Sequence, residues 1–147
     1  MHLSLNRGVL VATDGSTSAA RAEGVAAAIA AGRNCRLMVM TVSRGLPGDE
    51  LRRLAHIEGD LGKARHKLIE NILNEAADRA RRAGVTDVTT LATYGDPAAA
   101  IIATAEREQV DLIVMGRRGV NALSQLLLGS VSRSVIDHAS CAVTVVP

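Results

Sequence analysis

The chain has almost no aromatic side chains: its 147 residues include no Trp, no Phe and a single Tyr, Tyr94. This absence argues against modules that stack nucleic-acid bases on aromatic platforms. Hydrophobic residues still make up 48% of the chain and charged residues 22%, which excludes disorder by composition. The length is that of one ordinary domain, and we expect a single domain over residues 1–147 with a core of aliphatic side chains.

The sequence also lacks a basic patch. Seventeen Lys and Arg stand against fifteen Asp and Glu, and basic runs do not exceed the doublets at 52–53, 81–82 and 117–118. Binding to a phosphate backbone needs clustered positive charge, so we expect no nucleic-acid partner.

Cysteines and long apolar runs are scarce as well. Cys35 and Cys141 are far apart, form no CxxC pair and have no neighbours at metal-ligand spacing. The apolar stretches are shorter than the roughly 20 residues of a membrane helix. Because residues 1–8 lack the charged and apolar regions of a signal peptide, we expect a soluble, cytoplasmic protein with reduced thiols and no membrane partner.

Short strand-type runs alternate with helical patterns along the chain. We expect strands at 9–13, 36–42, 85–94, 111–115 and 142–146, and helices at 16–31, about 60–83, 97–107 and 130–138. Gly32 and Gly84 are predicted to end the first two helices, and Asp60 and Asp96 to cap the second and third. Alternation without hairpin turns predicts an α/β fold, a doubly wound open parallel sheet with helices on both faces.

Two segments carry residues suited to a ligand, and both follow predicted strands. Thr13-Asp14-Gly15-Ser16 follows the first strand, and Gly116-Arg117-Arg118-Gly119 ends the fourth and continues to Gly129-Ser130. Ligands of open α/β sheets bind at the carboxyl ends of strands. Glycines allow backbone N–H groups to approach an anion, a helix amino terminus attracts it, and Ser130 and Ser132 add hydroxyl donors. These segments predict a phosphate cradle if the two strands are neighbours.

Other interpretations of these residues stay open. The sequence has neither the Gly-rich lysine loop of many nucleotide-binding proteins nor the dinucleotide-binding glycine fingerprint. Asp14 suits a ribose hydroxyl or a divalent metal, but Asp14-Gly15-Ser16 also suits a plain strand-to-helix turn with Ser16 as the helix cap. The four histidines are scattered and match no catalytic triad, so we expect no catalytic residues.

Several segments together resemble one family. The run from Val9 to Ser16 (VLVATDGS), the run Tyr94-Gly-Asp-Pro97 and the run from Asp111 to Gly116 are similar to the universal stress protein family. The resemblance extends along nearly the whole chain. The spacing Gly116-x2-Gly119-x9-Gly129-Ser130 resembles the signature of the family's ATP-binding branch.

The resemblance implies a five-stranded sheet in the order 3-2-1-4-5 and a site for ATP, or AMP or ADP, with Mg²⁺. It implies that Asp14 contacts the ribose or the metal, that the Val42 backbone recognises adenine, and that Met115 lies against the nucleoside. The implied binding residues are Thr13, Asp14, Val42, Met115, Gly116, Gly119, Gly129, Ser130, Val131 and Ser132. With so few aromatics, we expect aliphatic side chains and backbone to hold adenine, with Tyr94 away from the crevice.

The resemblance further implies a homodimer joined through the last strand, Ala142–Val146, an apolar edge that favours pairing. The leading hypothesis is an ATP-binding stress-response regulator whose conformation, or binding of a protein partner, depends on the nucleotide. A slow ATPase or phosphotransferase and a nucleotide-independent dimeric scaffold are the alternatives. The chain departs from the family in having Ser140-Cys141 where Pro is frequent and Arg133 where an acidic residue is frequent.

Overall fold

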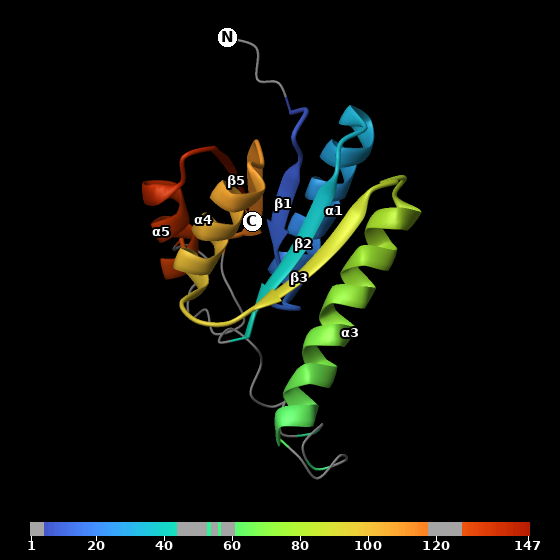
Figure 1. Cartoon of the computed structure of the whole chain (residues 1–147), viewed down its shortest axis with the longest axis vertical. Coiled ribbons are helices and arrows are strands. Elements are labelled where there is room, and N and C mark those ends of the chain that lie inside the picture. Colours follow the sequence, from blue (N-terminus) through green and yellow to red (C-terminus); the bar gives the residue numbers. More distant parts are fainter. Residues whose placement is uncertain (1–4, 44–52, 54–55, 57–60, 118–127) are drawn as a thin grey trace.

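Five parallel strands form one sheet in the order β3-β2-β1-β4-β5 (Figure 1). The structure is a computed structural model that describes residues 5–43, 53, 56, 61–117 and 128–147. The strands are β1 (Val9–Ala12), β2 (Leu37–Val42), β3 (Val88–Thr93), β4 (Leu112–Gly116) and β5 (Ala142–Val146). The predicted fold class and strand order are confirmed, and β1 lies between β2 and β4. The carboxyl ends of these three strands therefore meet at one edge.

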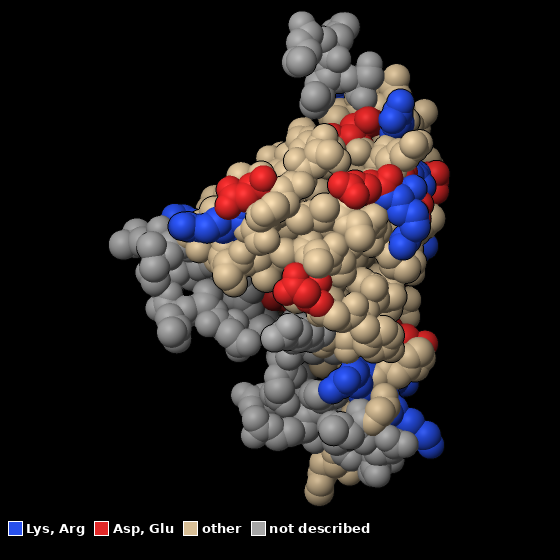
Figure 2. Space-filling model, turned by 60° about the vertical axis from the view of Figure 1, so that its left-hand side comes forward, with Lys and Arg blue, Asp and Glu red and all other residues tan. Residues whose placement is uncertain are grey.

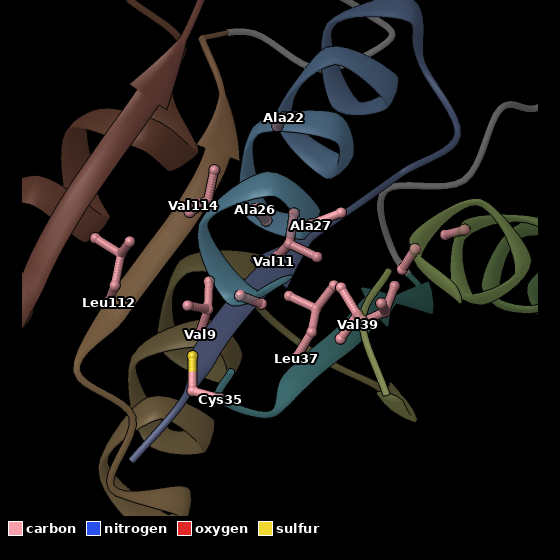
Figure 3. Close-up of a cluster of buried hydrophobic side chains, with 14 of the residues drawn as sticks. Val9, Val11, Ala22, Ala26, Ala27, Cys35, Leu37, Val39, Leu112 and Val114 are labelled. Atoms are coloured by element: carbon pink, nitrogen blue, oxygen red, sulfur yellow. The ribbon is translucent and has the colours of Figure 1, made fainter. Parts of the chain in front are cut away.

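Helices cover both faces of the sheet. Helices α1 (Thr17–Arg33) and α3 (Leu61–Arg82) pack on one face, and α4 (Pro97–Glu108) and α5 (Ser130–His138) lie on the other. Successive strand side chains point to opposite faces. Val9 and Val11 therefore join the core beneath α1 and α3 (Figure 3), while Leu10 joins the core beneath α4 and α5. Every residue of β2 is buried, as a strand covered on both sides requires.

Three helices end in the same way, with a residue in the left-handed region. These residues are Asn34 after α1 (φ 51°), Gly84 near the end of α3 (φ 101°) and Gln109 after α4 (φ 53°). In each case the N–H of the following residue closes the helix at 3.1 Å: Cys35 donates to Ala30 O, Val85 to Ala80 O and Val110 to Ala105 O. That closing side chain is buried, so each helix end is sealed by a hydrophobic contact.

These helix ends correct two predictions. Gly32 does not end α1, which continues to Arg33, because Asn34 takes the left-handed conformation instead. The third strand does not begin at Val85, since the N–H of that residue is used to close α3 and the strand starts at Val88. Asp96 caps α4 as predicted, its carboxylate accepting from the N–H of Ala99 at 2.9 Å. The predicted cap at Asp60 lies outside the described residues.

Helix α1 approaches the sheet closely because its inner face is alanine. Ala22, Ala26 and Ala30 are fully buried at i, i+4 spacing. One close approach is at Gly116, the last residue of β4: a Cβ there would lie 2.5 Å from Ser18 Oγ and 3.0 Å from the Ser18 carbonyl carbon. Glycine at this position is therefore required by the packing of α1 on β4.

This packing predicts opposite effects for two glycine-to-alanine substitutions. Gly116→Ala should lower the free energy of unfolding by about 1–3 kcal/mol, because the new methyl group meets the Ser18 backbone. Gly24→Ala, in the middle of α1 with nothing within 4 Å of the added Cβ, should raise it by about 0.5–1 kcal/mol. Urea unfolding measures both values, and a Gly116→Ala variant as stable as wild type would contradict the close packing.

Candidate functional site

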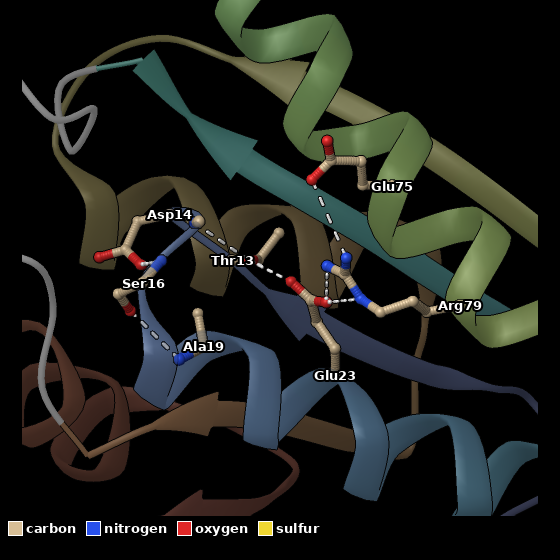
Figure 4. A network of polar contacts seen from close by, with 8 residues as sticks. Thr13, Asp14, Ser16, Ala19, Glu23, Glu75 and Arg79 are labelled. Atoms are coloured by element: carbon tan, nitrogen blue, oxygen red, sulfur yellow. Dashed lines mark hydrogen bonds and ion pairs between the residues drawn. The ribbon is translucent and has the colours of Figure 1, made fainter. Parts of the chain in front are cut away.

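The turn after β1 is held by its own side chains (Figure 4). Asp14 is half-buried, and its Oδ1 accepts a hydrogen bond from the N–H of Ser16 at 2.9 Å. Ser16 is the N-cap of α1, its Oγ accepting from the N–H of Ala19 at 3.1 Å. The interpretation of Asp14-Gly15-Ser16 as a strand-to-helix turn with a Ser cap is thus confirmed. It does not exclude a ligand, because the same turn places a carboxylate at the carboxyl edge of the sheet.

Thr13 anchors this turn to the sheet and to α1. Its N–H donates to Met40 O of β2 at 2.9 Å. Its hydroxyl donates to Glu23 Oε1 at 2.6 Å, and Glu23 Oε2 in turn accepts from Arg79 of α3. Sequence reasoning missed Glu23 and Arg79. The available signal was the spacing Ala19-Glu23-Ala27, which places one carboxylate on the alanine face of α1.

The amino terminus of α5 lies on the other side of Gly116. Gly129 is the N-cap and provides no side-chain cap for α5. Its N–H donates to Arg117 O at 2.9 Å, which ties the start of the helix to the end of β4. Intrahelical bonding begins with Arg133 N–H to Gly129 O at 3.0 Å, so the first-turn amides of α5 precede it and can point at an anion.

The two serines of this turn differ. Ser130 is exposed, whereas Ser132 is 2% exposed and its hydroxyl lies 2.8 Å from Gly116 O and 3.2 Å from Arg117 O. A hydroxyl has one proton, and here the backbone of β4 uses it. The two predicted phosphate donors therefore have different roles. The Ser130 side chain is exposed to solvent, whereas the Ser132 hydroxyl binds the backbone at the end of β4 and joins α5 to the sheet. Val131 is half-buried against the α4 and α5 core, and Gly119 lies outside the described residues.

Gly116 is where the two predicted segments converge. Ser18 in the first turn of α1 is in contact range on one side, and Ser132 in the first turn of α5 binds its carbonyl on the other. The amino termini of two helices thus meet at the end of one central strand. Three buried hydroxyls near this edge, Ser18 Oγ, Thr41 Oγ1 and Ser43 Oγ, have no hydrogen-bond partner among the described residues, and such orphan groups are few in folded proteins.

The two residues expected beside adenine are mostly covered by protein. Val42 and Met115 are 7% and 5% exposed and contribute their side chains to the core beneath α4 and α5. The backbone of Val42, at the end of β2, is the group that the resemblance assigns to adenine. Tyr94 is 69% exposed and follows β3 at the sheet edge, separated from β1 by β2, so it lies away from the edge formed by β1 and β4.

A cleft of about 400 Å³ opens beside the turn, on the α1 and α3 side. Its walls include Gly15 and Ser16 from the turn, Glu23 from α1, and Glu75 and Arg79 from α3. The first turn of α5 takes no part in its lining. The cleft therefore borders the Asp14 turn from the side opposite α5.

The thiols and histidines offer no competing site in the described part of the chain. Burial raises the pKa of both the Cys35 and the Cys141 thiol, so they stay protonated near neutral pH and are weak nucleophiles. Among the described residues no three His, Cys, Asp or Glu side chains gather as a metal site, and no helix is long and apolar enough to span a membrane. On the face in Figure 2, acidic and basic side chains are dispersed among uncharged ones.

Comparison with known proteins identifies the family. Residues 6–147 match the model of the universal stress protein family. The chain belongs to this family. It is 37% identical over 138 residues to a universal stress protein of Thermus aquaticus, in an alignment that covers 94% of this chain and 96% of that protein.

Solved structures of universal stress proteins share the fold. One, in complex with cAMP, is 34% identical, has a TM-score of 0.70 and is covered to 98%, with 97% of this chain aligned. Another, from Archaeoglobus fulgidus in complex with dAMP, is 23% identical with a TM-score of 0.69, covering 97% of this chain and 99% of that one. The latter likeness shows the fold alone.

The two serines in the first turn of α5, Ser130 and Ser132, make a matched test of this geometry. Ser132→Ala should lower the free energy of unfolding by about 1 kcal/mol, because the buried Gly116 carbonyl loses the Ser132 hydroxyl as a donor. Ser130→Ala, at an exposed position, should change it by less than about 0.5 kcal/mol. Urea denaturation measures the free energy of unfolding of both variants. Equal values for the two variants would contradict the structural role of Ser132.

Proposed function

We propose that this universal stress protein is an adenine-nucleotide-binding regulator, with ATP as the nucleotide and Mg²⁺ as its companion ion. The observation that carries the proposal is the convergence of two helix amino termini at Gly116, one of them without a side-chain cap. Such a place attracts phosphate through backbone N–H groups and the helix dipole. The cAMP bound to a relative that is 34% identical supports an adenine nucleotide.

The residues present fit such a ligand. The first-turn amides of α5 and the exposed Ser130 hydroxyl would hold phosphate, and Gly129 would let the phosphates approach the backbone. The Asp14 carboxylate would accept from ribose hydroxyls or share a Mg²⁺ ion with the phosphates. Bound Mg²⁺ would neutralise part of the phosphate charge. In this assignment Ser132 contributes its backbone N–H, since its hydroxyl binds Gly116 O.

The regulatory part of the proposal follows from what surrounds the site. We assign Asp14 to the ribose or the metal, and the Ser132 hydroxyl is engaged with Gly116 O, so we place no nucleophile among the described residues of the site. The nucleotide would instead bridge the first turns of α1 and α5, which both lie beside Gly116 at the end of β4. Bound nucleotide would then change the relative position of these two helices, and a protein partner would recognise the nucleotide-bound conformation.

Two substitutions test the site. Gly129→Val should weaken ATP·Mg²⁺ binding at least about tenfold, because its side chain occupies the phosphate approach while its backbone (φ −64°, ψ 154°) suits any L-residue. Asp14→Ala should weaken binding by a similar factor through loss of the carboxylate. Isothermal titration calorimetry measures both, with Gly24→Ala in the middle of α1 as the control that keeps wild-type affinity. Wild-type affinity in both site variants would overturn the assignment.

We further propose that two copies pair through β5. This strand is at the edge of the sheet and carries the apolar sequence Ala142–Val146, and an exposed apolar edge favours strand pairing. Light scattering after size exclusion should give twice the 15.3 kDa chain mass, with and without ATP. A monomer mass under both conditions would refute the dimer.

A further inference from the structure

Glu23 is a buried carboxylate on a helix face whose other buried residues are alanines and Ser18. It is 5% exposed, although α1 has Ala19 and Ala27 one turn before and after it on the same face. Both of its oxygens are engaged (Figure 4): Oε1 accepts from the Thr13 hydroxyl at 2.6 Å, and Oε2 accepts from two nitrogens of Arg79, with Nε at 3.1 Å. The buried negative charge of Glu23 is tolerated because each of its two carboxylate oxygens accepts a hydrogen bond.

This carboxylate sets the direction of the Thr13 hydroxyl. A carboxylate only accepts hydrogen bonds, so the single hydroxyl proton of Thr13 points at Glu23. The lone pairs of Thr13 Oγ1 are then left for the N–H of Gly15, which lies 3.3 Å away. This contact closes a small turn around Asp14, the residue between the two. Asp14 therefore lies in a turn whose closing hydrogen bond, from Gly15 N–H to Thr13 Oγ1, depends on Glu23.

The other end of the connection is on α3. Arg79 is 56 residues from Glu23 in sequence, its side chain is 45% exposed, and its NH1 lies 3.9 Å from Glu75 Oε2 one turn earlier on the same helix. Glu23, Arg79 and Gly15 all line the cleft between α1 and α3. A polar chain thus runs from a solvent-facing side chain of α3, through α1, to the turn that carries Asp14.

We propose that Glu23 and Arg79 are positioning residues of the nucleotide site, holding Thr13 and through it the Asp14 turn in the geometry that engages the ribose hydroxyls. This inference rests on the proposed function and deepens it. Glu23 and Arg79 do not touch the nucleotide. They affect how strongly Asp14 favours a ribose over a sugar that lacks the 2′ and 3′ hydroxyl groups.

An ion pair that merely joins α1 to α3 would behave differently. Breaking it would lower stability and would change the affinities for all nucleotides by the same factor. A positioning role predicts a selective loss, because only contacts made by Asp14 depend on the turn. The ratio of affinities for ATP and 2′,3′-dideoxy-ATP separates the two possibilities.

The variants Thr13→Val and Glu23→Gln test the connection without changing side-chain shape. Valine removes the hydroxyl. Thr13 and Arg79 donate to different oxygens of Glu23, and in glutamine one of these two atoms becomes an NH2 donor, so one of the two residues loses its acceptor. Thr13→Ser keeps the hydroxyl and serves as the conservative rescue. Thr104→Val is the matched control, since Thr104 is also a buried threonine (3% exposed) but lies on α4.

Calorimetry should show wild type preferring ATP over 2′,3′-dideoxy-ATP by about tenfold. In Thr13→Val and Glu23→Gln this preference should fall towards one, while Thr13→Ser and Thr104→Val keep it. In the unliganded proteins, the Gly15 amide resonance should move in Thr13→Val and Glu23→Gln and stay in place in Thr104→Val. This second measurement needs no nucleotide.

The outcomes distinguish the two proposals. A wild-type protein that binds neither nucleotide overturns the proposed function, and this inference with it. Nucleotide binding with an unchanged preference and unchanged Gly15 resonance in both variants overturns the positioning role alone. Equal weakening for ATP and the dideoxy analogue, with the preference intact, assigns Glu23 and Arg79 to helix packing only and also overturns it.

Discussion

The close approach of α1 to β4 at Gly116 is the constraint on which the rest of the site depends. The alanine face of α1 brings its backbone near the sheet, and only a residue without a side chain fits at the end of β4 beneath Ser18. With Gly116 in place, its carbonyl group is also available to the Ser132 hydroxyl. One residue thus fixes the amino termini of two helices on either side of a single strand end.

The site that results is made mainly of backbone. The residues at its edge use their side chains internally: Asp14 and Ser16 shape the turn, Thr13 binds Glu23, and Ser132 binds β4. The first-turn N–H groups of α5, which has no side-chain cap, are then the groups that we propose for a ligand, and such groups suit phosphate. The scarcity of aromatic side chains agrees with this arrangement, since Tyr94, the single aromatic residue of the chain, follows β3 at the far edge of the sheet.

Much of the fold was predictable because its signals are local. Alternating apolar runs placed all five strands, and the Asp96-Pro97 pair placed the start of α4. The helix ends were harder to predict from the sequence. Gly32 was the expected end of α1, yet Asn34 takes the left-handed conformation, and the N–H of the buried Cys35 makes the last hydrogen bond to the helix. Which residue ends a helix depended on which following side chain the core accepts, and local composition does not carry that information.

In the candidate site, too, some features could be predicted from the sequence and others required the folded structure. Sequence alone determined the strand and helix order, the family resemblance and the positions of Asp14, Gly116 and Gly129, since these follow from short-range patterns and spacing. Only the tertiary structure decided that Gly116 is needed by α1, that Ser132 faces β4, and that Glu23 and Arg79 support Thr13. Each of those facts is a contact between residues of different segments, such as Thr13 with Glu23 of α1, or Ser18 of α1 with Gly116 of β4. Such contacts exist only once the chain has folded, because packing and not spacing brings the atoms together.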